Sequence, residues 1–321
     1  MKNKINVVCI GGGSGLSHFV KAIKNIENIN LKCIVTVADN GGSSGILKTE
    51  YNVPALGDIR NVLVALSNVP EELSSLLDYR FTSGFLKEHS LGNIIIAGAM
   101  QSLDLNLNDT IQNLAKIFNA DGQIIPSTNE VVDIKATYFD DSEMIGEKNI
   151  SLPKKRIKKI SYLNDVKANE TAIEAIMQAD LIIYSIGSLY TSLIPNLIIP
   201  QISAALKKSK ARKIFFANLM SQPGETDNYS LSMYVQAINN HLGYQGVDIV
   251  IANNKNFSAK MIAKYKKQNA SPVIIDEINL GHELNLYQED IAIVKNNKII
   301  HDPEKIKKLF EGKILCRFQE M

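Results

Sequence analysis

Two glycine-rich segments near the N-terminus have the composition of anion-binding loops. The first is Gly11-Gly12-Gly13-Ser14-Gly15, and the second is Asn40-Gly41-Gly42-Ser43-Ser44-Gly45. Glycines leave backbone N–H groups uncovered and hydroxyls add further donors, so such loops suit a phosphate. The alternatives are a tight turn without ligand for the first segment and a flexible surface loop for the second. Three adjacent glycines exceed what a turn needs, which favours a ligand at the first.

Charged side chains accompany these loops. Asp39 stands directly before the second loop, where it could bind a ribose or hold Mg²⁺ beside phosphate oxygens. Asp58 and Arg60 follow in the segment Gly57-Asp58-Ile59-Arg60-Asn61. Asp58 is well placed as a helix N-cap. Arg60 in a first helical turn opposes the helix dipole, which points to a bidentate contact with a phosphate or carboxylate.

Later loops supply the remaining candidates. Ser90 is expected to cap a helix, whereas His89 is either a general acid or, by slight preference, a histidine that faces solvent. Two more polar, glycine-bearing loops follow the strands that are predicted at 181–185 and 213–217. The complete set of predicted ligand-binding residues is Gly12, Gly13, Ser14, Gly15, Asp39, Asn40, Gly42, Ser43, Ser44, Asp58, Arg60, Asn93, Ser188, Thr191, Ser192, Asn218, Gln222 and Glu225. No catalytic residue is assigned.

The apolar pattern predicts the elements that must position these side chains. A buried strand ends at Ile10, and Leu16, Phe19, Val20 and Ile23 then repeat with helical spacing. We expect an α/β fold with a Rossmann-like parallel sheet, helices on both faces, and an antiparallel excursion at about 127–165, all in a single domain over 1–321. Further predicted elements are strands at 33–38, 247–252 and 272–275, a central helix around 94–100, a second helix outside it at about 109–119, and a helix at 168–178.

Composition excludes several classes of protein. The net charge of +2 leaves no basic footprint for nucleic acid. Cys9, Cys33 and Cys316 are far apart, which argues for a reducing compartment, and no export signal is visible, so we expect a cytoplasmic location. The uncharged stretch 181–206 is interrupted by glycine and prolines, so no membrane span is expected. The sequence contains no P-loop, nucleophile elbow or metal-ligand spacing.

The glycines alone also allow a less favoured alternative, an NAD(P)-dependent oxidoreductase. The dinucleotide fingerprint needs a third glycine, and Leu16 takes its place. The sequence also offers no evident acid/base partner for hydride chemistry. Spacing alone therefore predicts a phosphate- or nucleotide-binding α/β protein without a visible catalytic centre.

The same motifs resemble one known family. The glycine loops and Gly57–Asn61 are similar to those of the gluconeogenesis factor (YvcK-like) family, which is related to the CofD-like phospholactate transferases. The resemblance extends over nearly the whole chain and includes Tyr79-Arg80-Phe81, His89-Ser90-Leu91-Gly92-Asn93, Gly187-Ser188-Leu189-Tyr190-Thr191-Ser192 and Gln222-Pro223-Gly224-Glu225-Thr226. It implies a cytoplasmic Rossmann-like regulator that binds nucleotide sugars such as UDP-N-acetylglucosamine and influences carbon metabolism, cell-wall synthesis and cell shape.

The sequence departs from that family pattern at three places. Ser185-Ile186 replaces a Gly-Pro, Met233-Tyr234 replaces an Asp-His, and Ile300 replaces a basic residue before His301-Asp302. The alternative to a regulator is a Mg²⁺-dependent CofD-like transferase, an enzyme that transfers a phosphorylated group from a nucleotide diphosphate. The expected partners are a nucleotide sugar or other nucleotide diphosphate and a metabolic or cell-wall protein, while homo-oligomerisation stays open.

Overall fold

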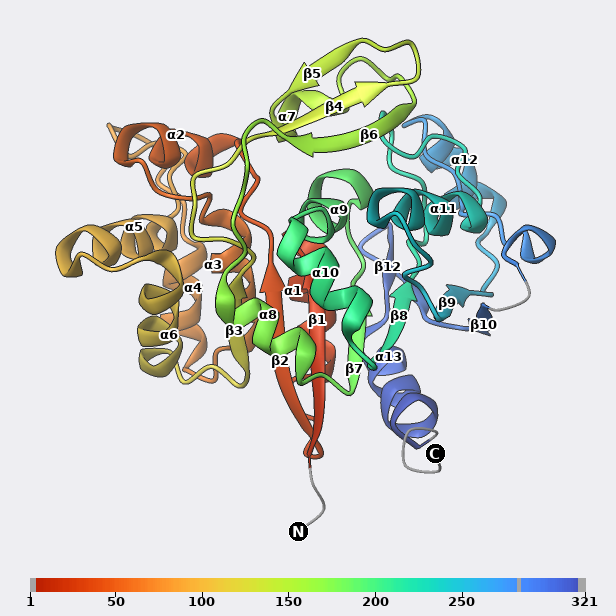
Figure 1. Cartoon of the computed structure of the whole chain (residues 1–321), viewed down its shortest axis with the longest axis horizontal. Coiled ribbons are helices and arrows are strands. Elements are labelled where there is room, and N and C mark those ends of the chain that lie inside the picture. The colour runs from red at the N-terminus through yellow and green to blue at the C-terminus, as the bar shows by residue number, and fades with distance from the viewer. Residues whose placement is uncertain (1–3, 282–283, 317–321) are drawn as a thin grey trace.

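A seven-stranded parallel sheet forms the centre of the computed structural model, which describes residues 4–281 and 284–316 (Figure 1). Residues 1–3 lie outside the described residues. They belong to the N-terminal segment in which we expect no export signal. The strand order is β10-β9-β8-β7-β1-β2-β3. The strands are β1 Ile5–Gly11, β2 Ile29–Val35, β3 Gln123–Pro126, β7 Leu181–Tyr184, β8 Arg212–Phe216, β9 Ile249–Asn253 and β10 Asn285–Glu289.

The chain reverses its direction of winding between β1 and β7. β1 pairs with β2 on one side and with β7 on the other, so this is the topological switch point where ligands of open α/β sheets bind. The central strands β1 and β7 are buried. Cys9 of β1 lies beside Cys33 of β2, and neither side chain is exposed. The prediction of a parallel sheet with two buried cysteines is confirmed.

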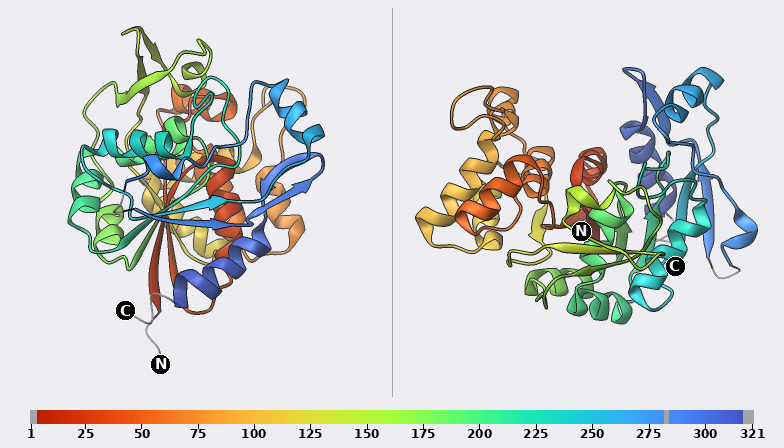
Figure 2. Two further views of the ribbon diagram at one scale, coloured as in Figure 1. Left: turned by 90° about the vertical axis from the view of Figure 1, so that its right-hand side faces the viewer. Right: turned by 90° about the horizontal axis from the view of Figure 1, so that it is seen from above.

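Helices cover both faces of the sheet (Figure 2). On one face α1 contacts both α3 and α13, whereas α8, α9 and α10 pack along the other. Apolar residues at helical spacing explain this burial: Leu16, Phe19, Val20 and Ile23 of α1 all face the core. These helices are α1 Gly13–Ile23, α3 Gly57–Leu66, α8 Glu170–Met177, α9 Ile194–Leu197, α10 Pro200–Lys208, α11 Leu231–Leu242 and α13 Pro303–Leu309.

A group of helices stands to one side of the sheet (Figure 1). It comprises α2 Gly42–Tyr51, α4 Glu71–Asp78, α5 Leu91–Leu103 and α6 Leu107–Ile117, beside α3. The expectation that the apolar helix at 94–100 is central is wrong, because only Gly92, Asn93, Ile96 and Ala97 of α5 are buried. The helix α6, expected outside it, contacts edge strand β3, as do α3 and α8.

A three-stranded antiparallel sheet lies above the carboxyl ends of the central strands (Figure 1). It comprises β4 Ile134–Tyr138, β5 Glu143–Ile145 and β6 Ile157–Tyr162, in the order β5-β4-β6, with the short helix α7 Glu147–Ile150 between β5 and β6. This confirms the predicted antiparallel excursion. We call residues 127–165 the insertion.

The C-terminal part differs most from expectation. The segment 272–275 is not a strand and makes only isolated bridges to Met220 and Ser230, while the edge strand is β10. Besides β10, the elements not predicted there are β11 Ala292–Lys295, β12 Lys298–His301, α12 Ala259–Lys266, α13, and the short helices η2 Glu277–Asn279 and η3 Phe310–Ile314. A further short helix, η1 Leu189–Leu193, follows β7. Within the described ranges no single helix is long and apolar enough to span a bilayer, although the pair Leu189–Leu197 and Pro200–Lys208, bent by 74°, passes the same test by length and composition.

Candidate functional site

The first glycine loop joins β1 to α1 at the switch point. Gly12 is the N-cap of α1 and offers no side-chain cap, so the N–H groups of the first turn have no intrahelical acceptor. Gly13 adopts the left-handed conformation with φ of +62°. The N–H of Gly13 donates to the Asp58 carboxylate. Those of Ser14 and Gly15 belong to the same first turn and suit an anion.

The glycines of this loop serve different purposes. A Cβ on Gly12 would lie 2.5 Å from Asp58 Oδ2 and from Thr36 Cγ2, and a Cβ on Gly15 would lie 2.1 Å from the carbonyl oxygen of Ile186. These two glycines therefore allow backbone and side chains to pack closely. A Cβ on Gly13 would meet only Ser192 Oγ, at 3.5 Å. Close packing, rather than ligand approach alone, explains the run of glycines.

A cavity of about 750 Å³ opens beside the loop. We call it the switch-point cavity. Its lining includes nine of the predicted residues: Gly12, Gly13, Ser14, Gly15, Ser188, Thr191, Ser192, Asn218 and Gln222. It also includes residues that were not predicted as ligand-binding, among them His18, Glu147, Ile186, Met220, Tyr265, Gln268, Ile300 and His301. The loops after β1, β7 and β8 meet here, as expected of the carboxyl edge of a parallel sheet.

Hydrogen bonds hold the loops after β7 and β8 in register. Ser188 caps η1 by accepting the Thr191 N–H (3.0 Å), and its hydroxyl donates to Glu225. Gln222 Nε2 donates to the other Glu225 oxygen at 2.6 Å. Asn218 Nδ2 donates to the Gly187 carbonyl at 2.7 Å. The buried Glu225 therefore stands behind the cavity and orders its wall.

Carboxylates concentrate negative charge around the cavity. Burial, reinforced by the nearby Asp39, raises the pKa of Asp58 to about 7. Burial likewise raises the pKa of Glu225 to about 7, although Ser188 donates to it. The pKa of Glu147 is also raised, first by burial and then by Asp39. Each shift reflects a site that disfavours further negative charge unless a cation or proton accompanies it.

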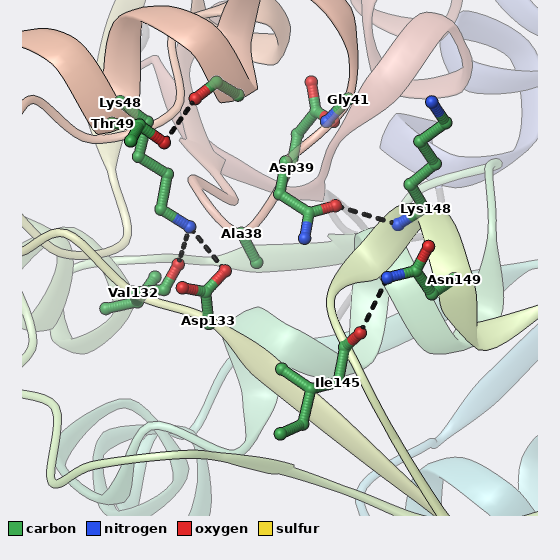
Figure 3. A network of polar contacts seen from close by, with 12 residues as sticks. Ala38, Asp39, Gly41, Lys48, Thr49, Val132, Asp133, Ile145, Lys148 and Asn149 are labelled. Atoms are coloured by element: carbon green, nitrogen blue, oxygen red, sulfur yellow. Dashed lines mark hydrogen bonds and ion pairs between the residues drawn. The ribbon is translucent and has the colours of Figure 1, made fainter.

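Glu147 of the insertion lines the switch-point cavity. Figure 3 shows the contacts that Lys148, next to Glu147, and Lys48 make with neighbouring segments. The backbone N–H of Lys148 donates to Asn40 Oδ1 at 3.0 Å. The buried Lys48 of α2 donates to the Val132 carbonyl at 2.5 Å and pairs with Asp133 at 2.6 Å. These contacts fix the insertion to the segment after β2. No local signal in the sequence marks Glu147, because its position depends on this long-range docking.

Apart from Glu225, the remaining predicted residues do not line the switch-point cavity and form a second group in the segment after β2 and in the first turns of α3 and α5, where Asp58 contacts Gly13 of the first loop. These residues are Asp39, Asn40, Gly42, Ser43, Ser44, Asp58, Arg60 and Asn93. Ser43 Oγ lies 3.1 Å from His89 Nδ1 and accepts from Asn93 Nδ2 at 3.3 Å. Ser44 Oγ accepts the Gly57 N–H at 3.0 Å. The preference for a solvent-facing His89 is wrong, since only 7% of this residue is exposed. Ser90 caps α5 as predicted, by accepting the Asn93 N–H.

Two local expectations about this second group need correction. The segment expected as a loop at 40–45 is partly helical, because α2 begins at Gly42. Asp58 is not an N-cap: that position in α3 belongs to Leu56, and the Asp58 carboxylate accepts from Gly13 instead.

Arg60 has an unusual environment for a cation. It is 6% exposed, donates through Nη2 to Asn61, and lies 3.6 Å from Asp78 through Nε. Within the described residues Nε and Nη1 have no hydrogen-bond partner. Buried donors of a charged group normally have partners, so this arrangement is compatible with the predicted anion contact.

A dedicated metal centre is not evident. Among residues 4–281 and 284–316, no group of three or more His, Cys, Asp or Glu side chains could hold a metal ion. Mg²⁺ does not require such a cage, since it commonly binds one or two carboxylates together with phosphate oxygens. Asp39, next to Asp58 and Glu147, fits that pattern by charge and ligand type.

Comparison with known proteins agrees with this architecture. The model of the family described as 2-phospho-L-lactate transferase CofD matches residues 7–297. A gluconeogenesis factor of Halalkalibacterium halodurans is 39% identical over 317 residues, covering 98% of each chain. The gluconeogenesis factor of Bacillus subtilis is 36% identical and covers 96% of this chain and 98% of the relative.

Solved structures show the same fold. A crystal structure of a Bacillus halodurans protein has a TM-score of 0.93 at 38% identity, with 96% of this chain and 100% of that one covered. Another, described as a member of the UPF0052 family, has a TM-score of 0.91 over 95% of this chain and 99% of the other. The chain therefore belongs to the CofD family, in the group whose members are named gluconeogenesis factors.

Proposed function

We propose that this protein binds a nucleotide sugar of the UDP-N-acetylglucosamine class in the switch-point cavity and acts as a cytoplasmic regulator of carbon metabolism, cell-wall synthesis and cell shape. One observation carries the proposal: the cavity of about 750 Å³ lies at the β1–β7 switch point, against the uncapped N-terminus of α1. Its size suits a nucleotide, and the helix end suits the phosphates.

The diphosphate would lie against the first turn of α1. The N–H groups of Ser14 and Gly15 provide donors, and Ser192 lines the same cavity beside Ser188 and Thr191, whose hydroxyls donate to Glu225 and to Ser188. Asp58 already occupies the Gly13 N–H. Ligand phosphates would therefore use the next two N–H groups of the turn.

Mg²⁺ would accompany the phosphates. Asp39 is the proposed ligand, with Glu147 and Asp58 nearby as sources of negative charge. Burial raises the pKa of Asp58 and of Glu147, and repulsion from Asp39 raises both further. A divalent cation would relieve that repulsion, which supports the proposal. The metal would neutralise the charge of the phosphates at a site whose carboxylates otherwise repel phosphate.

Regulation without turnover is the preferred form of the proposal. Tyr234, at a family acid/base position, is buried and donates its hydroxyl to Thr226 at 2.9 Å. Desolvation by burial also raises its pKa, so it stays neutral near pH 7. A regulator would transmit ligand binding to a metabolic or cell-wall protein, and the insertion, which carries Glu147, is the segment best placed to respond.

The CofD-like transferase is the second candidate, and one observation favours it. Asp58 and Glu225 both have a pKa of about 7, which is the range that suits a general acid or base. In this alternative one of them would accept the proton of a hydroxyl on a second substrate, whose oxygen would bond to the phosphorus of the transferred group while the bond from that phosphorus to the nucleotide breaks and the nucleotide leaves.

Calorimetry with UDP-sugars, UDP, GDP and NAD(P)H, each with Mg²⁺ and with a chelator, tests the proposal. We expect Ser14→Asp to weaken UDP-sugar binding at least about tenfold, because the new carboxylate would face the phosphates. Ser17→Asp, on the same helix but not lining the cavity, is the matched control. Equal affinities in the two variants would place the phosphates elsewhere. Mass spectrometry of the ligand after long incubation separates the candidates, since catalytic conversion would favour the transferase.

A further inference from the structure

A second cavity, of about 210 Å³, lies at the amino ends of four central strands. We call it the amino-end cavity. The first residues of β7, β8, β9 and β10 all line it, namely Leu181, Arg212, Ile249 and Asn285. The switch-point cavity lies at the opposite, carboxyl ends of the strands, and among the described residues the two cavities share no lining residue.

The strand residues of the amino-end cavity lie on one face of the sheet. The strand register places Ile249 beside both Ile214 and Asn285, so one row of side chains crosses three strands. Helices α13 and η3, near the lower ends of β7 and β8 in Figure 1, cover this row through Leu309 and Ile314. Parallel sheets normally have both faces covered. The cover is incomplete here, since Ile249 and Ile314 are only partly buried.

The wall of the amino-end cavity is mainly aliphatic. Its six aliphatic residues are Leu181, Ile214, Ile249, Ile251, Leu309 and Ile314. The described lining contains no carboxylate. An engineered apolar cavity of about 150 Å³ is large enough to bind benzene. The amino-end cavity is larger, so a ring or a short hydrocarbon chain fits inside it.

Two cations line the amino-end cavity, and they differ in their partners. Lys313 Nζ pairs with Glu289 Oε1 at 2.6 Å. The exposed guanidinium of Arg212 has no ion pair or hydrogen bond among the described residues. The in-register neighbour of Arg212 is the buried Leu181, so this cation borders an apolar surface. An unpaired guanidinium beside an apolar cavity favours a ligand that carries an anionic group.

We propose that the amino-end cavity binds a small amphipathic anion, namely a carboxylate with a short aliphatic or aromatic body. The apolar body lies against Ile214, Ile251 and Ile314, and the carboxylate pairs with Arg212. This site is independent of the proposed nucleotide site, because the two cavities lie at opposite ends of the strands.

NMR titrations of the full chain with hexanoate, hexanol and hexylamine test the charge of the ligand. We expect hexanoate to bind at least about threefold more tightly than hexanol, and hexylamine to bind most weakly, because only the carboxylate pairs with Arg212. Arg212→Met should remove this order of affinity, whereas Arg212→Lys should keep it. Equal affinities of the natural chain for the three probes would overturn the proposal.

A variant that fills the cavity tests the location. Ile314→Trp places a large ring in the cavity from η3 and should weaken hexanoate binding at least about tenfold. Ile117→Trp is the matched control, because Ile117 is 69% exposed and is not part of the lining. Thermal unfolding establishes that both variants are folded, and the Arg212 variants decide the question if Ile314→Trp is not. Equal hexanoate affinity in the two tryptophan variants would overturn the location.

Two other occupants of the cavity would give different results. Residues 317–321 follow Cys316, the last described residue. If that segment filled the cavity, Phe318→Ser would bind hexanoate more tightly than the natural chain does. If a second copy of the chain filled it, hexanoate would dissociate a dimer in sedimentation velocity. Either result would overturn the proposal.

Discussion

Replacing Gly15 by alanine is expected to destabilise the protein by about 2 kcal/mol. The new Cβ would lie 2.1 Å from the Ile186 carbonyl oxygen and 2.7 Å from the Gly187 Cα, so backbone on the far side of the contact must move by about 1 Å. Overpacking of this kind costs about 1–3 kcal/mol, and the contact with backbone places it at the upper end. The better helix propensity of alanine returns about 1 kcal/mol.

Gly98→Ala is the control for this substitution. Gly98 is exposed in helix α5, and a Cβ there would meet nothing within 4 Å, so the same change should stabilise the protein by about 0.5–1 kcal/mol. Urea unfolding measures both, as shifts of the midpoint at constant slope. The two variants should shift in opposite directions, and Gly15→Ala should also weaken nucleotide binding by displacing the loop after β7. A stabilised Gly15→Ala protein would refute the close contact between the two loops.

Two further predictions concern pH. The pKa of Glu225 is raised by burial from 4.5 to about 7, so its contribution to stability is complete below pH 4.5 and is lost as pH rises through about 7. The Glu225→Gln variant should therefore become more stable relative to the natural chain as pH rises from 5 to 8. Urea unfolding at those pH values measures the difference, and an equal decline of stability in both proteins would contradict the prediction. His241 is neutral, accepting the Ile160 N–H at 2.9 Å and donating to the Ala237 carbonyl at 2.7 Å, and burial lowers its pKa. Its contribution is lost as pH falls below 6.5, so the natural chain should lose stability on acidification more steeply than His241→Gln; equal slopes would show that protonation does not break this contact.

Sequence patterns predicted five of the seven central strands, β1, β2, β7, β8 and β9, because these are short apolar runs followed by polar loops, whereas β3 and β10 were not predicted as members of this sheet. The strand ending at Gly11 and the helix from Gly13 to Ile23 follow directly from their spacing. The first turn of α2 could not be recognised, since Gly42, Ser43, Ser44 and Gly45 lack both apolar periodicity and helix propensity. Apolar composition likewise could not show that α5 packs at the periphery, because composition specifies burial only in combination with the surrounding elements.

The candidate site was also predictable in part, because polar loops follow the predicted strands. Loops that follow neighbouring parallel strands necessarily share one edge, so the order of strands and loops along the chain was enough to group Ser14, Ser188 and Asn218. Ser43 and Asn93 also contact each other, but they do so away from the switch-point cavity. Glu147 and Tyr265 reach that cavity through the docking of separate segments, which depends on tertiary contacts that no short motif encodes.

The position of β1 in the middle of the sheet has a consequence for synthesis. One edge of β1 pairs with β2 soon after both leave the ribosome, but the other edge waits for β7, whose last residue is Tyr184. At translation rates of about 5–20 residues per second, that edge stays unpaired for about 10–35 s. Nascent chains of this protein therefore leave the backbone N–H and C=O groups along one edge of a largely apolar strand unpaired for longer than most folding steps require, and the loop that must close to pair them is long.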